Sequence, residues 1–386
     1  MKFGRVFLVV PGLLVAALGD QSPWEEYSRV ECQAPTTDPL EGCPSETVLV
    51  GSDSKYATIK SAISSLPHDT SSQTLLILPG TYEEQVNVTR AGPVTLLGQT
   101  NAHNDLGSNT VEVLWRAVAG TGDNAFTAVL TVAPDLNASL TGAGPTGFAV
   151  AEEQPFGNTN FRAYNLNFTN DFLPYSAGPS LTLSTGYANS GFYHCSFSSY
   201  QDTIHVGKNA STYISHSSIG GQTDFLYGFG TLWITNSTLL LRGCGGGVTA
   251  WKGTNTTFEN EYGVYIVDGS VVKANDSLSI NHECALGRPW NSQHRSVFAR
   301  NYLDESILPA GYVEWSSSEP RVTNLTFMGE YEDFGPGFNL TGRMNEGDGV
   351  TIELDSELWA QYDSPLKVFH FPNGSFGNTD WIDWSV

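Results

Sequence analysis

The sequence predicts an all-β fold built as a β-solenoid, and three observations carry this prediction. Glycine accounts for 40 of the 386 residues, and only 15% of residues are charged. Short strand-like runs bounded by turn residues follow one another, whereas long amphipathic helical patterns are scarce. A degenerate repeat occupies the middle third of the chain. The clearest strand-like runs are Thr74–Leu78, Val94–Leu97, Ser180–Leu183 and Val264–Val267.

Each copy of the repeat has an aromatic residue, a mostly polar middle and a large apolar closing residue. The five copies are Phe161–Phe168, Phe192–Phe197, Tyr213–Ile219, Trp233–Leu239 and Tyr265–Val271. Their closing residues are 29, 22, 20 and 32 positions apart. Repeats of this length favour solenoid coils that stack by parallel strand pairing at about 4.8 Å. Periodicity alone leaves a sandwich or jelly roll of unrelated strands as the alternative.

One segment, residues 57–66, is expected to be helical. Its apolar residues share one face of a helix: Ile59, Ala62, Ile63 and Leu66. No low-complexity linker interrupts the chain from Thr47 to Val386. We therefore expect one domain over residues 47–386, preceded by a small N-terminal segment, residues 20–46.

The net charge of −22, from 40 acidic and 18 basic residues, excludes two classes of partner. Nucleic acid is bound by surfaces that neutralise phosphates, and anionic membranes attract basic segments. We expect this protein to bind neither. An apolar fraction of 40% in a chain of this length also excludes disorder and the small disulfide-stapled class.

The N-terminus is typical of a secretory signal peptide. Lys2 and Arg5 give it a positive charge, and the apolar stretch that follows, Val6–Leu18, is too short to span a bilayer. Small residues before position 20 suit cleavage, so residues 1–19 are expected to be removed from a secreted, extracellular protein. Ten glycosylation sequons agree with this prediction: Asn87, Asn137, Asn167, Asn209, Asn236, Asn255, Asn275, Asn324, Asn339 and Asn373.

An odd number of cysteines, five, leaves at least one thiol unpaired. Cys32 and Cys43 are close in sequence near the mature N-terminus, and we expect them to form a disulfide. Cys195, Cys244 and Cys284 show no metal-ligand spacing and are expected to be buried structural cysteines.

Two aspartates stand one repeat length apart. Asp202, in Tyr200–Thr203, and Asp224, in Gly221–Phe225, are separated by 22 residues. On a solenoid this spacing can place both carboxylates on adjacent coils, within several Å of each other. Like charges at that distance cannot both ionise easily, which gives one acid and one nucleophile or base at the same pH. The alternative from spacing alone is that both are ordinary turn-forming aspartates.

No segment predicts a metal or cofactor site. The eight histidines have no metal-ligand spacing, and the GxGxxG match at Gly142–Gly147 contains a proline and lacks a following amphipathic helix. The glycine run Gly243–Gly247 is interpreted as a flexible turn.

These residues carry a resemblance to a known family. The matching segments, in chain order, are Gly80–Glu84 (GxYxE), Tyr200–Thr203 (YQDT), Asp224–Gly228 (DFIFG), Leu286–Trp290 (LGRPW, unchanged) and Gly311–Trp315 with Glu330–Gly337 (GW…W and EY…GPG). In order and spacing the chain resembles the pectin methylesterases (pectinesterases), as a fungal-type secreted member, from about Thr47 to its C-terminus. The resemblance implies a right-handed parallel β-helix and a carboxylic ester hydrolase that removes methyl esters from the galacturonate units of pectin. It implies pectin as the partner and no cofactor or metal, and a monomer is the default expectation.

The resemblance also implies roles for individual residues. Asp224 would be the nucleophile and Asp202 the general acid/base. Gln201 would stabilise the oxyanion, and Arg288 would hold Asp224. The predicted substrate contacts are Trp290, Gln222, Trp251 and Tyr82.

Two segments depart from the family pattern. The family carries a second Gln about two dozen residues before YQDT, and Pro179, which has no side-chain donor, stands there. Gln222, two residues before Asp224 and hence on the same strand face, is a candidate substitute. The family's TAQG segment is Thr249–Lys252 here, in which Trp251 either lines the substrate groove or packs in the core.

Two other functions compete with an active esterase. The first is a catalytically weak or inactive β-helix that binds a polysaccharide, which the Pro179 departure favours. The second is a pectate lyase or polygalacturonase on the same solenoid, for which we find no motif. Gln201, Asp202, Asp224 and Arg288 together favour catalysis, because a binding protein would not need that set.

Overall fold

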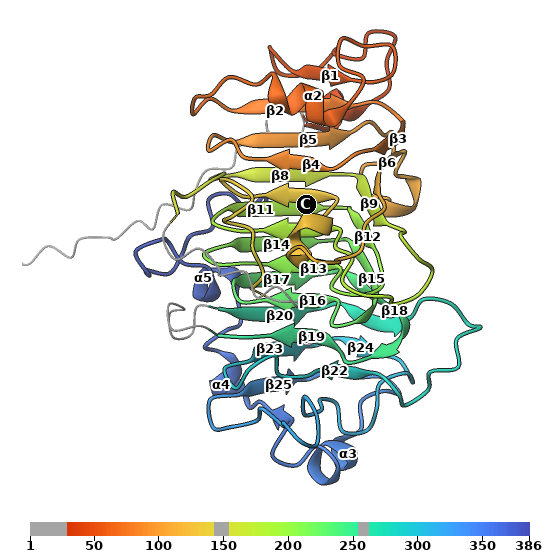
Figure 1. Ribbon diagram of the computed structural model, residues 1–386, viewed down its shortest axis with the longest axis vertical. Coiled ribbons are helices and arrows are strands. Elements are labelled where there is room, and N and C mark those ends of the chain that lie inside the picture. The colour runs from red at the N-terminus through yellow and green to blue at the C-terminus, as the bar shows by residue number, and fades with distance from the viewer. Residues whose placement is uncertain (1–28, 143–153, 254–261) are drawn as a thin grey trace, which may run out of the picture.

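The computed structural model describes residues 29–142, 154–253 and 262–386, which form a parallel β-helix (Figure 1). Each coil contributes short strands to three sheets, and the strands described pair in parallel with those of the next coil. A sandwich or jelly roll would pair its strands antiparallel, so the structure excludes that alternative.

The three sheets run the length of the stack. The first contains β1 (Val48–Val50), β2 (Gln73–Ile77), β5 (Val94–Gly98), β8 (Phe161–Tyr164), β11 (Asn189–Tyr193), β14 (Ser211–Ser215), β17 (Thr231–Thr235), β20 (Gly263–Val267), β23 (Arg295–Ala299), β25 (Phe327–Tyr331) and β26 (Ile352–Glu353). The second contains β4 (Val86–Val88), β7 (Leu130–Val132), β10 (Leu183–Thr185), β13 (Ile204–Val206), β16 (Leu226–Gly228), β19 (Gly247–Trp251) and β22 (Ala285–Gly287). The third contains β3 (Gly80–Glu83), β6 (Val111–Trp115), β9 (Leu166–Asn170), β12 (Ser196–Ser198), β15 (Ser218–Thr223), β18 (Thr238–Gly245), β21 (Ser270–Lys273) and β24 (Tyr302–Leu303).

The closing residues of the predicted repeat form one ladder. Register pairs Phe168 with Phe197, then Ile219, Leu239 and Val271, and all five side chains are buried in the central core. The closing residues therefore mark the coils as the repeat predicts.

The opening aromatics occupy two different faces of the first sheet. Tyr213, Trp233 and Tyr265 are in register and face outward into a second apolar cluster. Phe192, by contrast, pairs with Ile214 and faces the central core, as does Phe161. One residue of offset moves a strand side chain to the opposite face, so the predicted equivalence of these aromatics is wrong for the first two copies.

Three of the four predicted strands correspond to β2, β5 and β20. The fourth prediction, Ser180–Leu183, is displaced, because β10 begins only at Leu183. The preceding residues are irregular, although the N–H groups of Ser180 and Thr182 donate to the carbonyls of Gln201 and Thr203 on the next coil.

The predicted helix is confirmed as α2 (Ile59–Ser64), which covers the N-terminal end of the stack (Figure 1). Ile59 and Ala62 are buried against the first coils. The Glu84 carboxylate accepts the N–H groups of Ile59 and Lys60 at 2.7 and 2.8 Å, which satisfies two free donors of the first turn. The remaining helical segments are η1 (Leu106–Ser108), η2 (Asn124–Thr127), α3 (Leu340–Asn345), α4 (Ser356–Trp359) and α5 (Pro365–Val368).

The last nine residues, 378–386, form a strap that returns along the stack to its middle coils (Figure 1). The Tyr164 hydroxyl donates to Asp383 Oδ2 at 2.7 Å, and the Asp383 N–H donates to the Tyr193 hydroxyl at 2.6 Å. Arg162 Nε donates to the Trp381 carbonyl at 3.0 Å. The strap and the segment before it cover the outer aromatic face of the first sheet.

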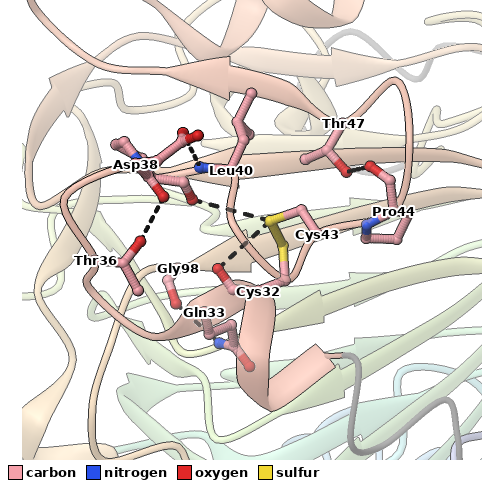
Figure 2. The surroundings of a disulfide bond; sticks show 10 residues. Cys32, Gln33, Thr36, Asp38, Leu40, Cys43, Pro44, Thr47 and Gly98 are labelled. Carbon is pink, nitrogen blue, oxygen red and sulfur yellow. Dashed lines mark hydrogen bonds between the residues drawn. A yellow bond between two sulfur atoms is a disulfide. The ribbon is translucent and has the colours of Figure 1, made fainter.

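The predicted disulfide between Cys32 and Cys43 is confirmed (Figure 2). Beside it, the Gln33 amide donates to the Gly98 carbonyl at 2.8 Å and attaches the N-terminal segment to the coils. A second disulfide joins Cys244 to Cys284, which corrects the expectation that these were simply buried structural cysteines. Cys195 is buried and is the one free thiol of the five cysteines, all of which lie in the described residues.

Neither a membrane-spanning helix nor a group of metal ligands is found within the described ranges. No helix in this part of the chain has both the length and the apolar character needed to cross a membrane. Among the same residues, no three His, Cys, Asp or Glu side chains are grouped as metal ligands. The predicted signal peptide and the sequon at Asn255 lie outside the described residues.

Candidate active site

Asp202 and Asp224 occupy equivalent positions on neighbouring coils. Each stands two residues before a strand of the second sheet, and those strands pair Ile204 with Leu226. The Asp202 N–H donates to the Thr223 carbonyl at 3.1 Å, immediately before Asp224. Both aspartates adopt the left-handed backbone conformation, with φ of +58° and +46°, and both are 7% exposed. They are therefore turn residues, as the alternative held, and also neighbouring buried carboxyls.

Asp224 is held by a guanidinium and a backbone N–H. Arg288, the residue after β22, donates from Nε to Oδ1 at 2.9 Å and from Nη2 to Oδ2 at 2.6 Å. The Gly247 N–H donates to Oδ1 at 3.0 Å. The Arg288 guanidinium also lies 4.0 Å from the centre of the Trp315 ring, which fixes its plane. Paired charge-assisted bonds of this kind are short and geometrically specific.

Asp202 has a different environment. Its pKa is raised well above the ordinary value, first by burial and then by the neighbouring Asp224 carboxylate. Its Oδ2 accepts a hydrogen bond from Asn124 Nδ2 at 3.2 Å. The two carboxyls thus differ in their partners: Asp224 faces a cation, whereas Asp202 faces a neutral amide.

Gln201 precedes Asp202 and bridges to Thr223 of the next coil. Its side-chain Oε1 accepts from the Ser176 hydroxyl at 3.0 Å, and the same hydroxyl lies 3.1 Å from Thr223 Oγ1. Because its oxygen is engaged by Ser176, the amide presents its Nε2 as a donor on the other side.

The glycine run Gly243–Gly247, which joins the end of β18 to the start of β19, permits close approach to Asp224. At Gly246, with φ of +73°, an added Cβ would lie 2.3 Å from Asp224 Oδ1 and 2.8 Å from Arg288 Cζ. The Cys244–Cys284 disulfide ties this run to the strand that leads into Arg288. The interpretation of Gly243–Gly247 as a flexible turn is therefore wrong, because the run is held by the disulfide and packs directly against Asp224 and Arg288.

Trp290 lies in a half-buried aromatic group. Its ring centre is 5.5 Å from that of Tyr227 and 6.5 Å from that of Phe229. The Lys252 ammonium lies 3.8 Å from the Trp290 ring centre and donates to the Thr141 carbonyl at 3.3 Å. Burial lowers the pKa of Lys252 to about 8. A partly covered indole beside a cation is a surface that a sugar acid can contact.

Comparison with known proteins gives a consistent answer. A family model described as Pectinesterase matches residues 122–362. The curated "Probable pectinesterase A" of Aspergillus niger is 30% identical over 345 residues, which cover 89% of each chain. The chain belongs to the pectinesterase family. "Pectinesterase" of Aspergillus aculeatus is 29% identical over 348 residues, covering 89% of this chain and 92% of the relative.

Solved structures show the same fold. The pectin methylesterase from Aspergillus niger superposes with a TM-score of 0.67 at 24% identity, covering 89% of this chain and 98% of that one. The carrot enzyme gives 0.65 at 21% identity, covering 86% and 97%. A pectin methylesterase in complex with a hexasaccharide gives 0.61 at 20% identity, covering 86% and 100%. This pectinesterase is thus an esterase whose fold is a right-handed parallel β-helix.

Two predicted substrate contacts of this pectinesterase lie in its interior. Trp251 has no exposed surface, and its indole N–H donates to the Gly230 carbonyl at 3.1 Å, so the core role is the correct one. Tyr82 is 8% exposed, packs in the central core, and its hydroxyl donates to the Leu78 carbonyl at 2.8 Å. Neither side chain is placed to contact a polymer on the surface.

The strand alternation on which the Gln222 prediction rested does not hold at this position. The pairing of β15 with β18 is irregular between Gly221 and Thr223, and the N–H groups of Gln222 and Thr223 both donate to the Tyr200 carbonyl. This irregularity breaks the alternation on which the prediction rested. The Gln222 amide instead lies against Gly243, where an added Cβ would be 3.0 Å from its Cδ.

Pro179 lies on the coil before Gln201, beside the predicted oxyanion position, since the next N–H, of Ser180, donates to the Gln201 carbonyl. Three further residues of the site were missed from sequence: Asn124, Ser176 and Lys252. Asn124 stands far from any of the family segments named above, whereas Ser176 lies only three residues before Pro179, in the segment that departs from the family pattern. Lys252 was visible beside Trp251 in the changed TAQG segment, and its charge in a low-charge chain was the signal that could have found it.

Proposed function

We propose that this pectinesterase hydrolyses methyl esters of galacturonate in pectin through an Asp224 nucleophile and an Asp202 general acid/base. One observation carries the proposal: two buried carboxyls lie side by side, one paired with Arg288 and the other with its pKa raised. Such a pair provides an ionised nucleophile and a protonated acid at one pH. The hexasaccharide complex of the similar methylesterase supports a polymeric sugar substrate.

In the first half-reaction, a carboxylate oxygen of Asp224 attacks the ester carbonyl carbon. Oδ1 accepts two hydrogen bonds, from Arg288 and Gly247, and Oδ2 accepts one, so Oδ2 is the better placed to attack. As the C–O bond to the methoxy group breaks, Asp202 gives its proton to that oxygen and methanol leaves. The product is an anhydride between Asp224 and the galacturonate carbonyl.

In the second half-reaction, Asp202 is a carboxylate and takes a proton from water. The water oxygen attacks the anhydride carbonyl and the bond to Asp224 breaks, which restores the Asp224 carboxylate. The galacturonic acid product keeps the second proton of the water and loses it to solvent as galacturonate, and Asp202 is protonated again. No net proton is consumed by the two carboxyls, so the site returns to its starting state.

The Nε2 donor of Gln201, left available by the Ser176 contact, is proposed to stabilise the oxyanion formed in both half-reactions. One such donor contributes about 3–4 kcal/mol in known oxyanion holes. Trp290 is proposed to pack against the sugar with the part of its ring that stays exposed.

The cellular context is proposed from the sequence. Residues 1–19 are proposed as a signal peptide, 20–46 as an N-terminal segment and 47–386 as the catalytic domain of a secreted, glycosylated monomer acting on plant cell-wall pectin. The two disulfides are compatible with an oxidising, extracellular location. None of the nine described sequon asparagines is buried, which is compatible with glycosylation.

Methanol release from highly methylated pectin tests the proposal. Wild type is expected to release methanol, whereas Asp224→Ala and Asp202→Asn are expected to lose nearly all activity while binding pectin. No release by wild type at any pH from about 4 to 8 would contradict the esterase proposal and favour a polysaccharide-binding protein. Full activity of Asp224→Ala would contradict the assigned nucleophile.

A further inference from the structure

The side chain of Asn124 is buried against Asp202. It is 3% exposed, and its Nδ2 donates to Asp202 Oδ2 at 3.2 Å. Its amide also interacts with the buried hydroxyl of Tyr227. An apolar residue at position 124 would leave Asp202 Oδ2 without this donor. The amide is therefore placed to act on the buried carboxyl of Asp202.

We propose that Asn124 is a positioning residue that sets which oxygen of Asp202 carries the catalytic proton. This inference rests on the proposed function, in which Asp202 is the general acid/base. Oδ2 already accepts the Asn124 N–H and is thereby the favoured unprotonated oxygen. The proton of the neutral carboxyl then resides on Oδ1, and its direction is fixed by the same hydrogen bond.

The neutrality of the amide matters to this role. A cation at position 124 would favour the carboxylate form of Asp202 and would remove the acid. An amide orients the group while adding no charge. The Asn124 hydrogen bond lowers the pKa of Asp202 against the stronger effects of burial and Asp224. It thus also stabilises the carboxylate left after proton transfer.

Three titratable groups face Asp202 from the following coils: Asp224, Arg288 and Tyr227. The pKa of Tyr227 is raised well above its ordinary value by burial and then by Asp202, so this phenol stays neutral in the working pH range. Asp224 and Arg288 keep their mutual ion pair when Asn124 is changed. A change in the pH profile of an Asn124 variant therefore reports on Asp202.

The segment that carries Asn124, which is the start of η2, is fixed by the preceding residue, Asp123. The Asp123 Oδ1 accepts the N–H groups of Ala125 and Thr141 at 2.9 and 3.0 Å, as well as the Thr141 hydroxyl at 3.0 Å. Asp123 is 1% exposed, and it closes the start of η2 onto a segment 18 residues later. Asn124 is consequently presented to Asp202 from a rigid turn.

The test is the pH dependence of kcat/KM for methylated pectin in Asn124→Leu, which keeps the volume but removes the donor. Without that donor the pKa of Asp202 rises, and because the first half-reaction needs protonated Asp202, the basic limb is expected to move upward by roughly one pH unit. The maximum rate is expected to fall about 10-fold through lost orientation. Asn124→Ala, which also lacks the donor, is expected to give the same shift if leucine does not fit.

Asn301→Leu is the matched control. Asn301 is fully buried and its Nδ2 donates to the buried Asp333 at 3.1 Å, a similar pair in which Asp333 also has a raised pKa, but on a different part of the stack. This control is expected to lower the melting temperature and leave the pH profile unchanged. A folded Asn124→Leu or Asn124→Ala whose basic limb coincides with wild type overturns the inference. An inactive wild type or an active Asp202→Asn instead overturns the proposed function.

Discussion

The Arg288 guanidinium meets both carboxylate oxygens of Asp224, at 2.9 and 2.6 Å, across 64 residues of sequence. The pair is only partly accessible, with side-chain exposures of 22% for Arg288 and 10% for Asp224. Glycine at position 246 leaves the space in which the pair forms. This corner of the molecule therefore depends on three separate coils being in register.

Arg288→Ala is expected to reduce kcat on methylated pectin by roughly 10²–10³-fold, because Asp224 loses its charged partner and its orientation. Arg288→Lys keeps the charge but cannot reproduce two parallel bonds, so an intermediate loss is expected. The measurement is initial methanol release at saturating substrate.

Arg300→Ala provides the matched control for that experiment. Arg300 makes the same bidentate ion pair on the exposed surface, donating from Nε to Asp268 Oδ1 at 2.7 Å and from Nη2 to Oδ2 at 2.8 Å. Its removal is expected to leave kcat unchanged. An equal loss in both variants would show that the effect at Arg288 is one of general stability.

Asp202→Asn is expected to be inactive yet more stable than wild type at neutral pH. The folded pKa of Asp202 is raised, so its favourable contribution to folding exists below the unfolded pKa and is lost as pH rises through the folded value. Asparagine resembles the protonated form at every pH. The difference in melting temperature should be near zero at about pH 3 and grow as pH increases to 8.

Asp268→Asn, at an exposed carboxylate, should show no such gain in melting temperature. A decrease in stability of Asp202→Asn at pH 7 would mean that Asp202 is held as a carboxylate in the resting protein.

Replacing Cys244 and Cys284 by serine is expected to lower the free energy of unfolding by about 4 kcal/mol, from the 40-residue separation of the two cysteines. The same change should lower kcat, because the disulfide joins the glycine run Gly243–Gly247, beside Asp224, to the strand before Arg288. Denaturant unfolding and methanol release measure the two effects.

Replacing Cys32 and Cys43 by serine removes a disulfide spanning 11 residues and should destabilise by about 3 kcal/mol. This disulfide lies in the N-terminal segment, so kcat is expected to be unaffected (Figure 2). Equal kcat losses in the two double variants would show that the Cys244–Cys284 disulfide has no specific effect on activity.

Lys252→Met is expected to raise KM about 5-fold for partly de-esterified pectin at pH 6, with little change for fully methylated pectin. The ammonium beside Trp290 is a cation that a free galacturonate carboxylate can meet, and one such contact is worth about 1 kcal/mol in water. Its pKa of about 8 means that the difference should shrink at pH 9.

Lys273→Met, which removes a surface ion pair with Glu305, is the control and should not change the ratio of the two KM values. A Lys252→Met enzyme with an unchanged ratio at pH 6 would restrict Lys252 to a packing role.

The fold was predictable because every coil must bury one apolar residue at the same place. Phe168, Phe197, Ile219, Leu239 and Val271 occupy one ladder, and their recurrence is visible in the sequence. The faces of the aromatics were not predictable, since an offset of a single residue in register reverses the face without changing composition.

In the site, the 22-residue spacing of Asp202 and Asp224 was informative because it equals the length of one coil. Asn124 was not predictable, since it reaches Asp202 across 78 residues from a loop with no family motif. The burial of Trp251 and the irregularity of β15 around Gln222 depend on strand register, which only the folded chain shows.

The strap formed by residues 378–386 changes how such a stack can come apart. In a solenoid each coil contacts only its neighbours, so the ends can peel away while the middle persists. Here the last residues are bonded to Tyr164 and Tyr193 on middle coils, so the coils that follow Tyr193 in the chain are tied to the middle of the stack at both of their chain ends. Unfolding of these C-terminal coils is therefore expected to be coupled to that of the middle coils.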